Sequence, residues 1–426
     1  MLETRVGAGK RWAVHLGLAG LGLFAFGALQ FPAVANLGLG LALLGLLLDG
    51  RASARWLARE PLVGLLLLFA LALAAGLALA WPVAHRAEDL DAAGRLLKLW
   101  LFLPLAYWLG GRERRILAFL GVAAAGFLLG RLAALDWLAP PALVTGERIR
   151  LGISSINHFA LYAATASIGL ACFTPRVLRA LAALAPAARR VGIALWAAAL
   201  ALTLYWTIAA QSRGVWLGAV ATAAVLVVLL GWVRGRRALV VGLASAAVIA
   251  AVLGLAAGAL VAQRLEVELA TVGQALSGRW GELPYDSTGT RLHMIGFGLE
   301  RWREAPWLGH GPGGLTTVLQ QTGGELAVYK HLHNVFVDGL ARLGIVGTVL
   351  LQGLFVGVLV AAWRAFRAGT LAVDVALFAL GGLLLAFLAN LTDLRLFGWD
   401  WRNYWLLLAS VGYAVPMRGS ARSSAS

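Results

Sequence analysis

Apolar runs of nearly membrane-spanning length alternate with short polar stretches along most of the chain. A transmembrane helix needs roughly 20 predominantly apolar residues to cross about 30 Å of hydrocarbon. The runs predicted to span a membrane are 12–31, 34–49, 61–81, 96–110, 115–138, 155–174, 191–210, 214–233, 238–262, 334–363, 371–392 and 401–417. The pattern therefore predicts an all-α polytopic membrane protein with about twelve transmembrane helices, of which the second and fourth are short.

One long stretch of mixed composition interrupts this alternation, between about 263 and 333. It is too polar to lie within a bilayer, so we expect one large loop that contains short helices. The chain is thereby divided into helices 1–9 over residues 1–262, the loop over 263–333, helices 10–12 over 334–417 and a disordered tail over 418–426.

The composition excludes a soluble globular domain, because 61% of the 426 residues are hydrophobic, 13% are charged and the mean hydropathy is +0.81. Cys172 is the single cysteine, so no internal disulfide can form, and no Cys/His cluster has zinc spacing. The net charge of +16 is compatible with nucleic-acid binding, but the basic residues are scattered between apolar runs. We interpret them as topology signals and expect no nucleic-acid partner.

The distribution of Lys and Arg predicts the orientation, because the cytoplasmic loops of membrane proteins are enriched in both. Basic clusters occur in alternate connections, as in 51–59, 112–115, 176–190 and 234–237, whereas the intervening connections hold most of the acids. If the N-terminus is cytoplasmic, every short loop fits this enrichment of Lys and Arg on the cytoplasmic side. We therefore expect both termini in the cytoplasm and the 263–333 loop on the opposite side.

The large loop carries a predicted helix followed by a glycine-rich turn. Residues 287–290, Ser-Thr-Gly-Thr, offer an N-cap before apolar residues at helical spacing, which predicts a helix over about 290–304. Pro306 ends this helix, and PWLGHGPGG (306–314) supplies turn residues. Backbone amides in such a turn can approach an anion closely, although glycine-rich turns are common.

A polar cluster stands where the loop re-enters the membrane. His331, His333 and Asn334 come directly before the tenth apolar run, at the outer water–lipid boundary, where an imidazole can be solvated. They are either interfacial residues without a role or part of a site. Asp338 and Arg342 follow at a spacing of one helical turn and can neutralise each other, so a structural and a functional ion pair are both open.

A second polar group is expected on the same side of the membrane. Gln211, Ser212 and Arg213 lie in a tight outer turn, where Arg213 either snorkels to the interface or offers its fork of donors to phosphate oxygens. Polar residues near the outer ends of the sixth and eleventh spans are Asn157, His158, Asn390 and Asp393. Each alone fits a structural role, but together they converge on one face of the membrane.

An acidic motif offers a metal-binding alternative. Glu88-Asp89-Leu90-Asp91, expected in the outer loop after the third span, has the Asp-x-Asp spacing of metal-using glycosyltransferases. A solvated acidic loop explains the same residues more simply, so no metal site is expected there.

Three of these stretches resemble motifs of the O-antigen ligase and polymerase superfamily. QSRGVWLG (211–218) is similar to the family's arginine-bearing turn, and RLHMIGFGLERWREAPWLGHGPGG (291–314) is similar to its outer-loop helix and the turn after it. HNVFVDGLARLGIVG (333–347) resembles the His-Asn re-entry followed by a Gly-Ile-x-Gly span. The motifs cover a small part of the chain, and the expected span layout agrees with them.

The resemblance implies a type C glycosyltransferase-like membrane fold, inversion at the anomeric carbon, no metal and no cofactor. The donor in this superfamily is a glycan carried on undecaprenyl diphosphate. Ligases transfer it to a sugar hydroxyl of lipid A–core, in lipopolysaccharide biosynthesis, polymerases to another lipid-linked repeat, and protein O-oligosaccharyltransferases to Ser or Thr. The resemblance also implies a bacterial inner-membrane protein whose active site faces the periplasm.

The matching motifs carry roles over to three residues. Arg213 and Arg291 correspond to cations that bind the diphosphate, because without a metal fixed cations must stabilise the charge on this leaving group. His333 corresponds to the general base, since an imidazole with an unperturbed pKa of about 6.5 suits removal of a proton from an acceptor hydroxyl. The supporting candidates are Gln211, Ser212, Asn334, Asp338, His331, Asn157 and His158.

Among the branches we favour the ligase, because the chain is compact, has one dominant outer loop and lacks the long C-terminal region of many protein glycosyltransferases. A polymerase and a protein O-oligosaccharyltransferase are the alternatives within the superfamily. A transporter or flippase for lipid-linked glycans is the alternative from another class, but it should show paired internal repeats, which the sequence lacks. The acceptor cannot be read from the sequence.

Overall fold

The computed structural model describes residues 8–79, 86–136, 142–321, 323–393 and 396–414, and every regular element within them is helical. The cytoplasmic tail expected over 418–426 lies outside these ranges. The first elements are α1 (Ala8–Gly27), α2 (Pro32–Asp49), α3 (Arg51–Leu57), α4 (Pro61–Leu79), α5 (Arg86–Leu97), the 3₁₀ helix η1 (Lys98–Leu101), α6 (Phe102–Leu109), α7 (Glu113–Ala133) and α8 (Ala142–Thr145). The remainder are α9 (Ile156–Ala182), α10 (Pro186–Ala209), α11 (Arg213–Arg234), α12 (Arg236–Leu276), η2 (Trp280–Glu282), α13 (Ser287–Glu304), α14 (Gly314–Gln321), α15 (Val335–Arg367), α16 (Val373–Ala389) and α17 (Trp399–Tyr413).

Several helices have the length and composition of membrane spans. Within the described residues, seven helices are long and apolar enough to cross a bilayer, namely α2, α4, α7, α9, α10, α11 and α15. α16 is apolar but shorter. The prediction of an all-helical, multi-pass protein is therefore confirmed. Each of the runs predicted to span the membrane overlaps a helix, but the count of twelve stays a prediction.

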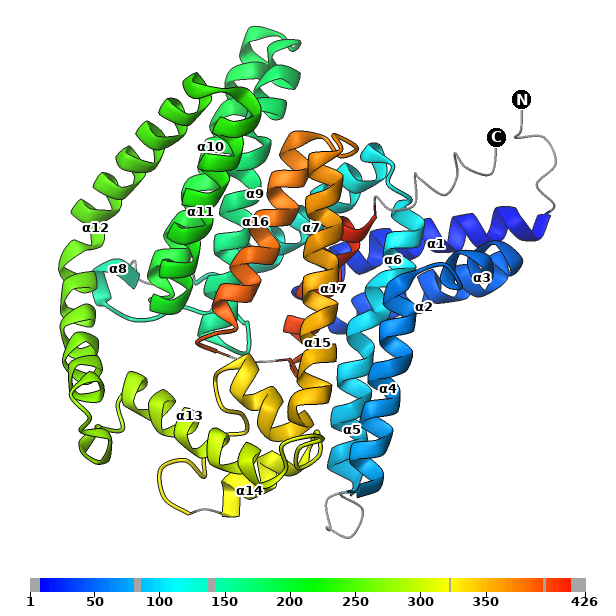
Figure 1. Ribbon diagram of the computed structural model, residues 1–426. Helices are drawn as coiled ribbons and strands as arrows, with labels where there is room; N and C mark the ends of the chain where they lie inside the picture. The colour runs from blue at the N-terminus through cyan, green and yellow to red at the C-terminus, as the bar shows by residue number, and fades with distance from the viewer. Residues whose placement is uncertain (1–7, 80–85, 137–141, 322, 394–395, 415–426) are drawn as a thin grey trace.

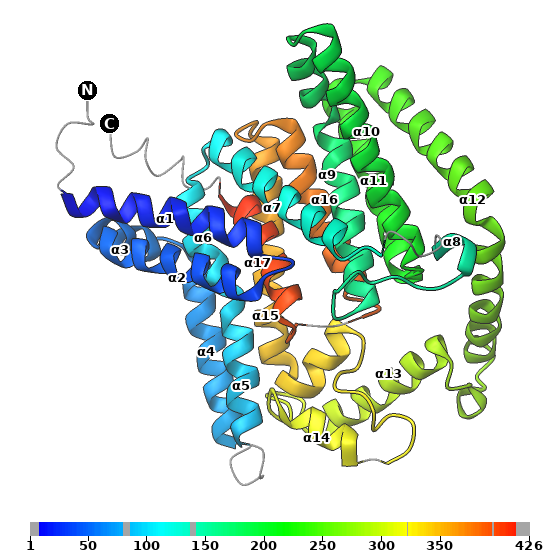
Figure 2. The ribbon, with the colours of Figure 1, turned by 180° about the vertical axis from the view of Figure 1, so that it is seen from behind.

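α15 lies near the centre of the molecule and packs against α4, α13, α16 and α17 (Figure 1). To one side of it, α9, α10, α11 and α16 form a group of neighbouring helices, and α12 stands at the edge against α11 (Figure 2). α1 and α2 form an antiparallel pair that contacts α6 and α7. Large aromatic side chains, including Trp401 and Trp405, fill the core around α17. α13, which belongs to the expected outer loop, packs against α12 and α15.

Two elements differ from the sequence expectation. The acidic motif belongs to the first turns of α5, which begins at Arg86, so the loop expected there is partly a helix. Acids in the first turn of a helix complement its dipole, which favours this earlier start. α12 continues to Leu276, beyond the end expected at 262, because its sequence past that point still holds good helix formers.

The glycine-rich turn after α13 packs into a break in α15. Gly344 has a left-handed φ of 61° inside α15, and a Cβ there would collide with the backbone of Trp307. The break frees the amides of Ile345 and Val346, which donate to the carbonyls of Pro306 (2.9 Å) and Trp307 (3.2 Å). The Gly-Ile-x-Gly span and the Pro-Trp-Leu-Gly turn are thus two halves of one packing contact.

Two backbone amides of that turn are already occupied by a carboxylate of the protein. Asp89 Oδ1 accepts from the amides of Gly313 (2.6 Å) and Gly314 (3.0 Å), at the start of α14. Asp89 is buried, so its carboxylate satisfies donors that would otherwise be orphaned at a helix N-terminus. The expected anion approach to the turn is therefore real, but the anion is Asp89, and the motif joins α5 to the outer loop.

Candidate active site

A pocket is lined by residues of α13 and of the ends of α9, α11 and α16. It encloses about 640 Å³ of empty space, part of which is open to solvent. The residues around it are Arg148, Asn157, His158, Leu161, Gln211, Ser212, Arg213, Gly214, Val215, Ser287, Arg291, Ala389, Asn390, Thr392, Asp393 and Trp401. Both arginines predicted to bind diphosphate therefore line one cavity, although they are far apart in sequence.

Arg213 is the first residue of α11, and the turn before it is tightly packed. Gly214 lies against Thr392, and a Cβ at this position would collide with the threonine hydroxyl. Gln211 adopts a left-handed φ of 52° and donates to the carbonyl of Gly146 at 2.8 Å. These contacts hold the half-buried Arg213 beside the 390–393 segment, at a helix N-terminus where the backbone dipole also favours an anion.

Arg291 lies in the second turn of α13, whose N-cap is Asp286 rather than the expected serine or threonine. Asp286 Oδ1 accepts from the amides of Thr288 (2.9 Å) and Gly289 (2.7 Å). Burial by itself would raise the pKa of the Asp286 carboxyl, but these hydrogen bonds and the positive charge of Arg213 hold it below its usual range. The start of α13 is therefore close to Arg213, which places Arg291 on the same pocket.

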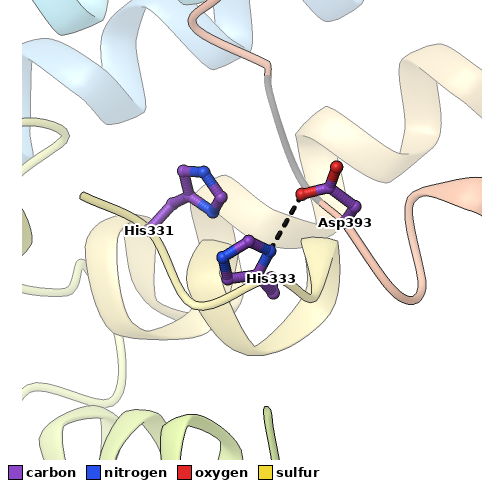
Figure 3. Close-up of side chains that lie close together, drawn as sticks. All are labelled: His331, His333 and Asp393. Carbon is purple, nitrogen blue, oxygen red and sulfur yellow. Dashed lines mark hydrogen bonds and ion pairs between the residues drawn. The ribbon is translucent and has the colours of Figure 1, made fainter. Parts of the chain in front are cut away.

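His333 reaches the wall of the pocket through Asp393 (Figure 3). Its Nδ1 lies 2.8 Å from Asp393 Oδ1, and the other carboxylate oxygen accepts from Asn157 Nδ2 at 2.8 Å. Burial by itself would raise the pKa of the Asp393 carboxyl, but the hydrogen bond and charge of His333, with His158 and Asn157, hold it below its usual range. His333 itself is not among the residues that line the cavity.

The backbone at His333 is strained, with a left-handed φ of 52°. Among the residues described, the other non-glycine residues with a positive φ are Leu151 and Gln211. Such conformations persist only where the surrounding structure enforces them, and they are enriched at functional sites. Two of the three lie in the candidate site or beside it.

Asn334 and Asp338 hold His333 from either side. The side chain of Asn334 caps α15 by accepting from Phe336 and Val337, and it donates to the carbonyl of Leu391 at 3.1 Å. Asp338 accepts from the amide of Leu332 at 3.0 Å. Both residues therefore position the backbone around His333 rather than facing the cavity.

The ion pair of Asp338 and Arg342 belongs to the same scaffold. Arg342 Nε donates to Asp338 at 2.8 Å, and its other nitrogens donate to the carbonyls of Pro312 (2.8 Å) and Lys330 (2.6 Å). Both side chains are buried. A guanidinium that binds loop carbonyls in this way fastens the outer loop onto α15, which is a structural role.

A second histidine–aspartate pair lies in the pocket wall. His158 Nδ1 is 2.9 Å from Asp400 Oδ2, and both side chains are 3% exposed. Ser154 also donates to Asp400, at 3.1 Å. His158 Nε2 is buried and has no hydrogen-bond partner among the residues described. This pair ties the start of α9 to the start of α17.

One group of side chains is arranged so that it could bind a metal ion. Within the described part of the chain, the ligand atoms of His331, His333 and Asp393 lie within 4.8 Å of one another (Figure 3). The rings of His331 and His333 are edge to face, with centroids 4.3 Å apart. No metal site was predicted here from the sequence.

Sequence reasoning named Asp393 without its histidine partner, and it missed Asp400 and Arg148 as contributors to this site. Asp393 and Asp400 follow spans as single acids, and nothing local indicates which histidine each one meets. Arg148, which lines the pocket beside Arg213, lies in the charged stretch ERIR (147–150) of an outer connection. That local excess of charge on the outer side was an available signal.

Residues 198–352 match the family model described as O-Antigen ligase. This match confirms the resemblance seen in the three motifs, all of which lie inside the matched range. It supports a glycosyltransferase-like enzyme of ligase or polymerase type, embedded in a membrane. Asn157, His158, Asp393 and Asp400 lie outside the matched range. No curated protein matches the chain.

Proposed function

We propose that this chain, whose residues 198–352 match the O-Antigen ligase family, is itself an O-antigen ligase. It transfers a glycan from undecaprenyl diphosphate to a sugar hydroxyl of lipid A–core, with inversion and without a catalytic metal. The observation that carries the proposal is one cavity lined by Arg213, Arg291 and Asp393, with His333 bound to Asp393.

The two arginines supply the positive charge that the leaving diphosphate requires. Cleavage of the sugar–phosphate bond leaves negative charge on the diphosphate, and preorganised cations stabilise such charge most where water is scarce. A guanidinium also presents a planar fork of donors that matches two phosphate oxygens. Arg213 and Arg291 are both half-buried, so they are shielded from bulk water while still reaching the cavity.

His333, hydrogen-bonded to Asp393, supplies the general base that the reaction requires. With Nδ1–H donating to Asp393, His333 Nε2 carries the lone pair that removes the acceptor hydroxyl proton as oxygen attacks the anomeric carbon. The carboxylate fixes this tautomer and stabilises the imidazolium that forms. Asn157 keeps the carboxylate in place, and Asn334 keeps the histidine at the start of α15.

The proposed orientation is supported by the ion pairs that charged residues form in the structure. Arg176, in the cytoplasmic connection 176–190, binds Asp374 at 2.5 and 2.9 Å and Glu113 at 2.7 Å. Glu113 lies in the cytoplasmic connection 112–115, and Asp374 lies at the expected cytoplasmic end of the 371–392 span. Arg213, Arg291 and Asp393, which are expected on the opposite side, line one pocket. We therefore propose twelve spans in a bacterial inner membrane, with cytoplasmic termini and a periplasmic site at the bilayer edge. A lipid-linked donor fits this depth, because its tail stays in lipid while its head group meets water.

The test offers the purified protein in nanodiscs a glycan on undecaprenyl diphosphate together with one of three acceptors: lipid A–core, a Ser/Thr peptide or a second lipid-linked repeat. Labelling of lipid A–core is the expected result. Labelling of the peptide or of the repeat would move the protein to the protein glycosyltransferase or polymerase branch. Movement of the intact donor across the bilayer, with no acceptor labelled, would replace the enzyme by a flippase.

A further inference from the structure

We infer that His331, His333 and Asp393 form a binding site for one transition-metal ion of the Zn²⁺ type, and that the bound ion switches transfer off. The second half of this inference rests on the proposed function, because it requires His333 to be the base. The first half, binding itself, does not. Figure 3 shows the three side chains converging from the loop before α15 and the segment after α16.

The geometry is close to that of a metal site without being closed onto one. The ligand atoms lie within 4.8 Å of one another, and His333 and Asp393 are already 2.8 Å apart. Four ligands at about 2.0–2.1 Å around a tetrahedral zinc ion are separated by roughly 3.3 Å. Small side-chain rotations therefore suffice, mainly an approach of His331 and a slight parting of the other two.

The donor set indicates which metal fits. Two imidazoles and one carboxylate are the ligand types of open zinc sites, which keep a fourth position for water. Imidazole ligands disfavour Mg²⁺ and Ca²⁺, which take oxygen. Asp393 is 8% exposed and His333 17%, so few waters compete for the ion.

A supporting partner for the carboxylate ligand is already in place. Asn157 donates to the Asp393 oxygen that His333 does not use. Outer partners of this kind orient metal ligands, and their loss typically weakens metal binding about 10- to 100-fold. Asn157 therefore gives the site a residue that can be changed without removing a ligand.

Metal binding and base catalysis exclude each other at His333. If the ion takes Nδ1, the ring proton now donated to Asp393 shifts by exchange with solvent to Nε2, which then has no lone pair, and the carboxylate binds the metal instead. If the ion takes Nε2, it occupies the lone pair that would accept the hydroxyl proton. In both cases the acceptor hydroxyl keeps its proton. Zn²⁺ is therefore an inhibitor here and chelation relieves it, which is consistent with a reaction that itself needs no metal.

Binding is tested on the full chain, purified in detergent without a polyhistidine tag and stripped of metal with EDTA. Calorimetry with Zn²⁺ is expected to give one site per chain, and Co²⁺ to give the visible absorption of a tetrahedral complex. His331→Ala and Asp393→Asn should abolish both signals, Asn157→Ala should weaken binding about 10- to 100-fold, and His293→Ala, a loop histidine outside the cluster, should change neither. Absence of binding, or binding unaffected by His331→Ala, overturns the site.

Inhibition is tested separately, as each variant's transfer rate in Zn²⁺ divided by its own rate in EDTA. The ratio should fall at least about tenfold for the unaltered protein and for His293→Ala, and stay near one for His331→Ala. A metal-bound protein that transfers at full rate overturns the switch. If the unaltered protein binds Zn²⁺ but His333→Ala transfers at the full rate, the metal site stands and the proposed base is wrong. If the unaltered protein binds no Zn²⁺ but His333→Ala loses transfer, the base stands and the metal site is wrong.

Discussion

Two histidine–aspartate pairs flank the same pocket and differ in how exposed the histidine is. His333–Asp393 and His158–Asp400 have nearly the same Nδ1–oxygen distance, 2.8 and 2.9 Å. The His333 side chain is 17% exposed and sits on a strained loop residue, whereas His158 is 3% exposed within α9. The pairing therefore does not decide function by itself. His158 lines the cavity and His333 meets it only through Asp393, but the buried His158 ring has little room to exchange a proton with a substrate. We therefore propose His333 as the base and a tie between helices as the role of His158.

The largest expected effect is the loss of the proposed base. His333→Ala should lower the transfer rate by about 10²–10⁴-fold, the usual contribution of general base catalysis, while the protein stays folded and membrane-inserted. His15→Ala, an exposed position on α1, is the matched control and should keep the rate. Rates are measured with lipid-linked donor in nanodiscs. An undiminished rate for His333→Ala would reverse the assignment of the base.

The cations of the pocket come next. Arg291→Ala and Arg213→Ala should each lower transfer by about 10²–10³-fold, because one preorganised charge on the leaving group is lost. Lysine at either position should restore only part of the rate, since it keeps the charge and loses the fork. Arg279→Ala, an exposed arginine of the same loop, serves as the control. Full recovery with lysine would show that charge alone suffices.

The two aspartates should differ in whether their replacement lowers the transfer rate or the stability. Asp393→Asn should lower the transfer rate by roughly 10²–10⁴-fold, because the amide no longer fixes the His333 tautomer or stabilises the imidazolium. Asp400→Asn should instead cost stability, about 1–3 kcal/mol for a buried group left partly unsatisfied, with a smaller loss of rate. Parallel rate and thermal-unfolding measurements distinguish them. The same profile for both variants would mean that the two pairs do one job.

The smallest expected effect is a pH dependence of stability. Because the folded pKa of the Asp393 carboxyl lies below its usual range near 3.9, the folded state binds fewer protons than the unfolded state as the pH falls through that region. The contribution of Asp393 is therefore complete above about pH 5 and is lost progressively below it. The difference in unfolding temperature between the unaltered protein and Asp393→Asn should shrink from pH 6 to pH 3. A constant difference would indicate that the pair contributes no charge-dependent stability.

Much of the fold was predictable because spans are local features. Each predicted run overlaps a helix, and the outer-loop helix expected over about 290–304 is α13 over Ser287–Glu304. The candidate site was predictable in part. Arg213 and Arg291 do line one cavity, whereas His333 meets its wall only through Asp393. The glycine-rich turn, judged by composition as able to approach an anion, receives that anion from Asp89 of α5.

The sequence alone determined that this is an all-helical membrane protein with three ligase-type motifs. A bilayer admits only segments that satisfy their own backbone hydrogen bonds and bury apolar side chains, and both conditions can be read within about 20 residues. Only the tertiary structure decided that His333 meets Asp393, 60 residues away, and that Asp393 meets Asn157, 236 residues away. Such meetings depend on how helices pack, which is set by many small contacts at once and leaves no periodic trace in the chain.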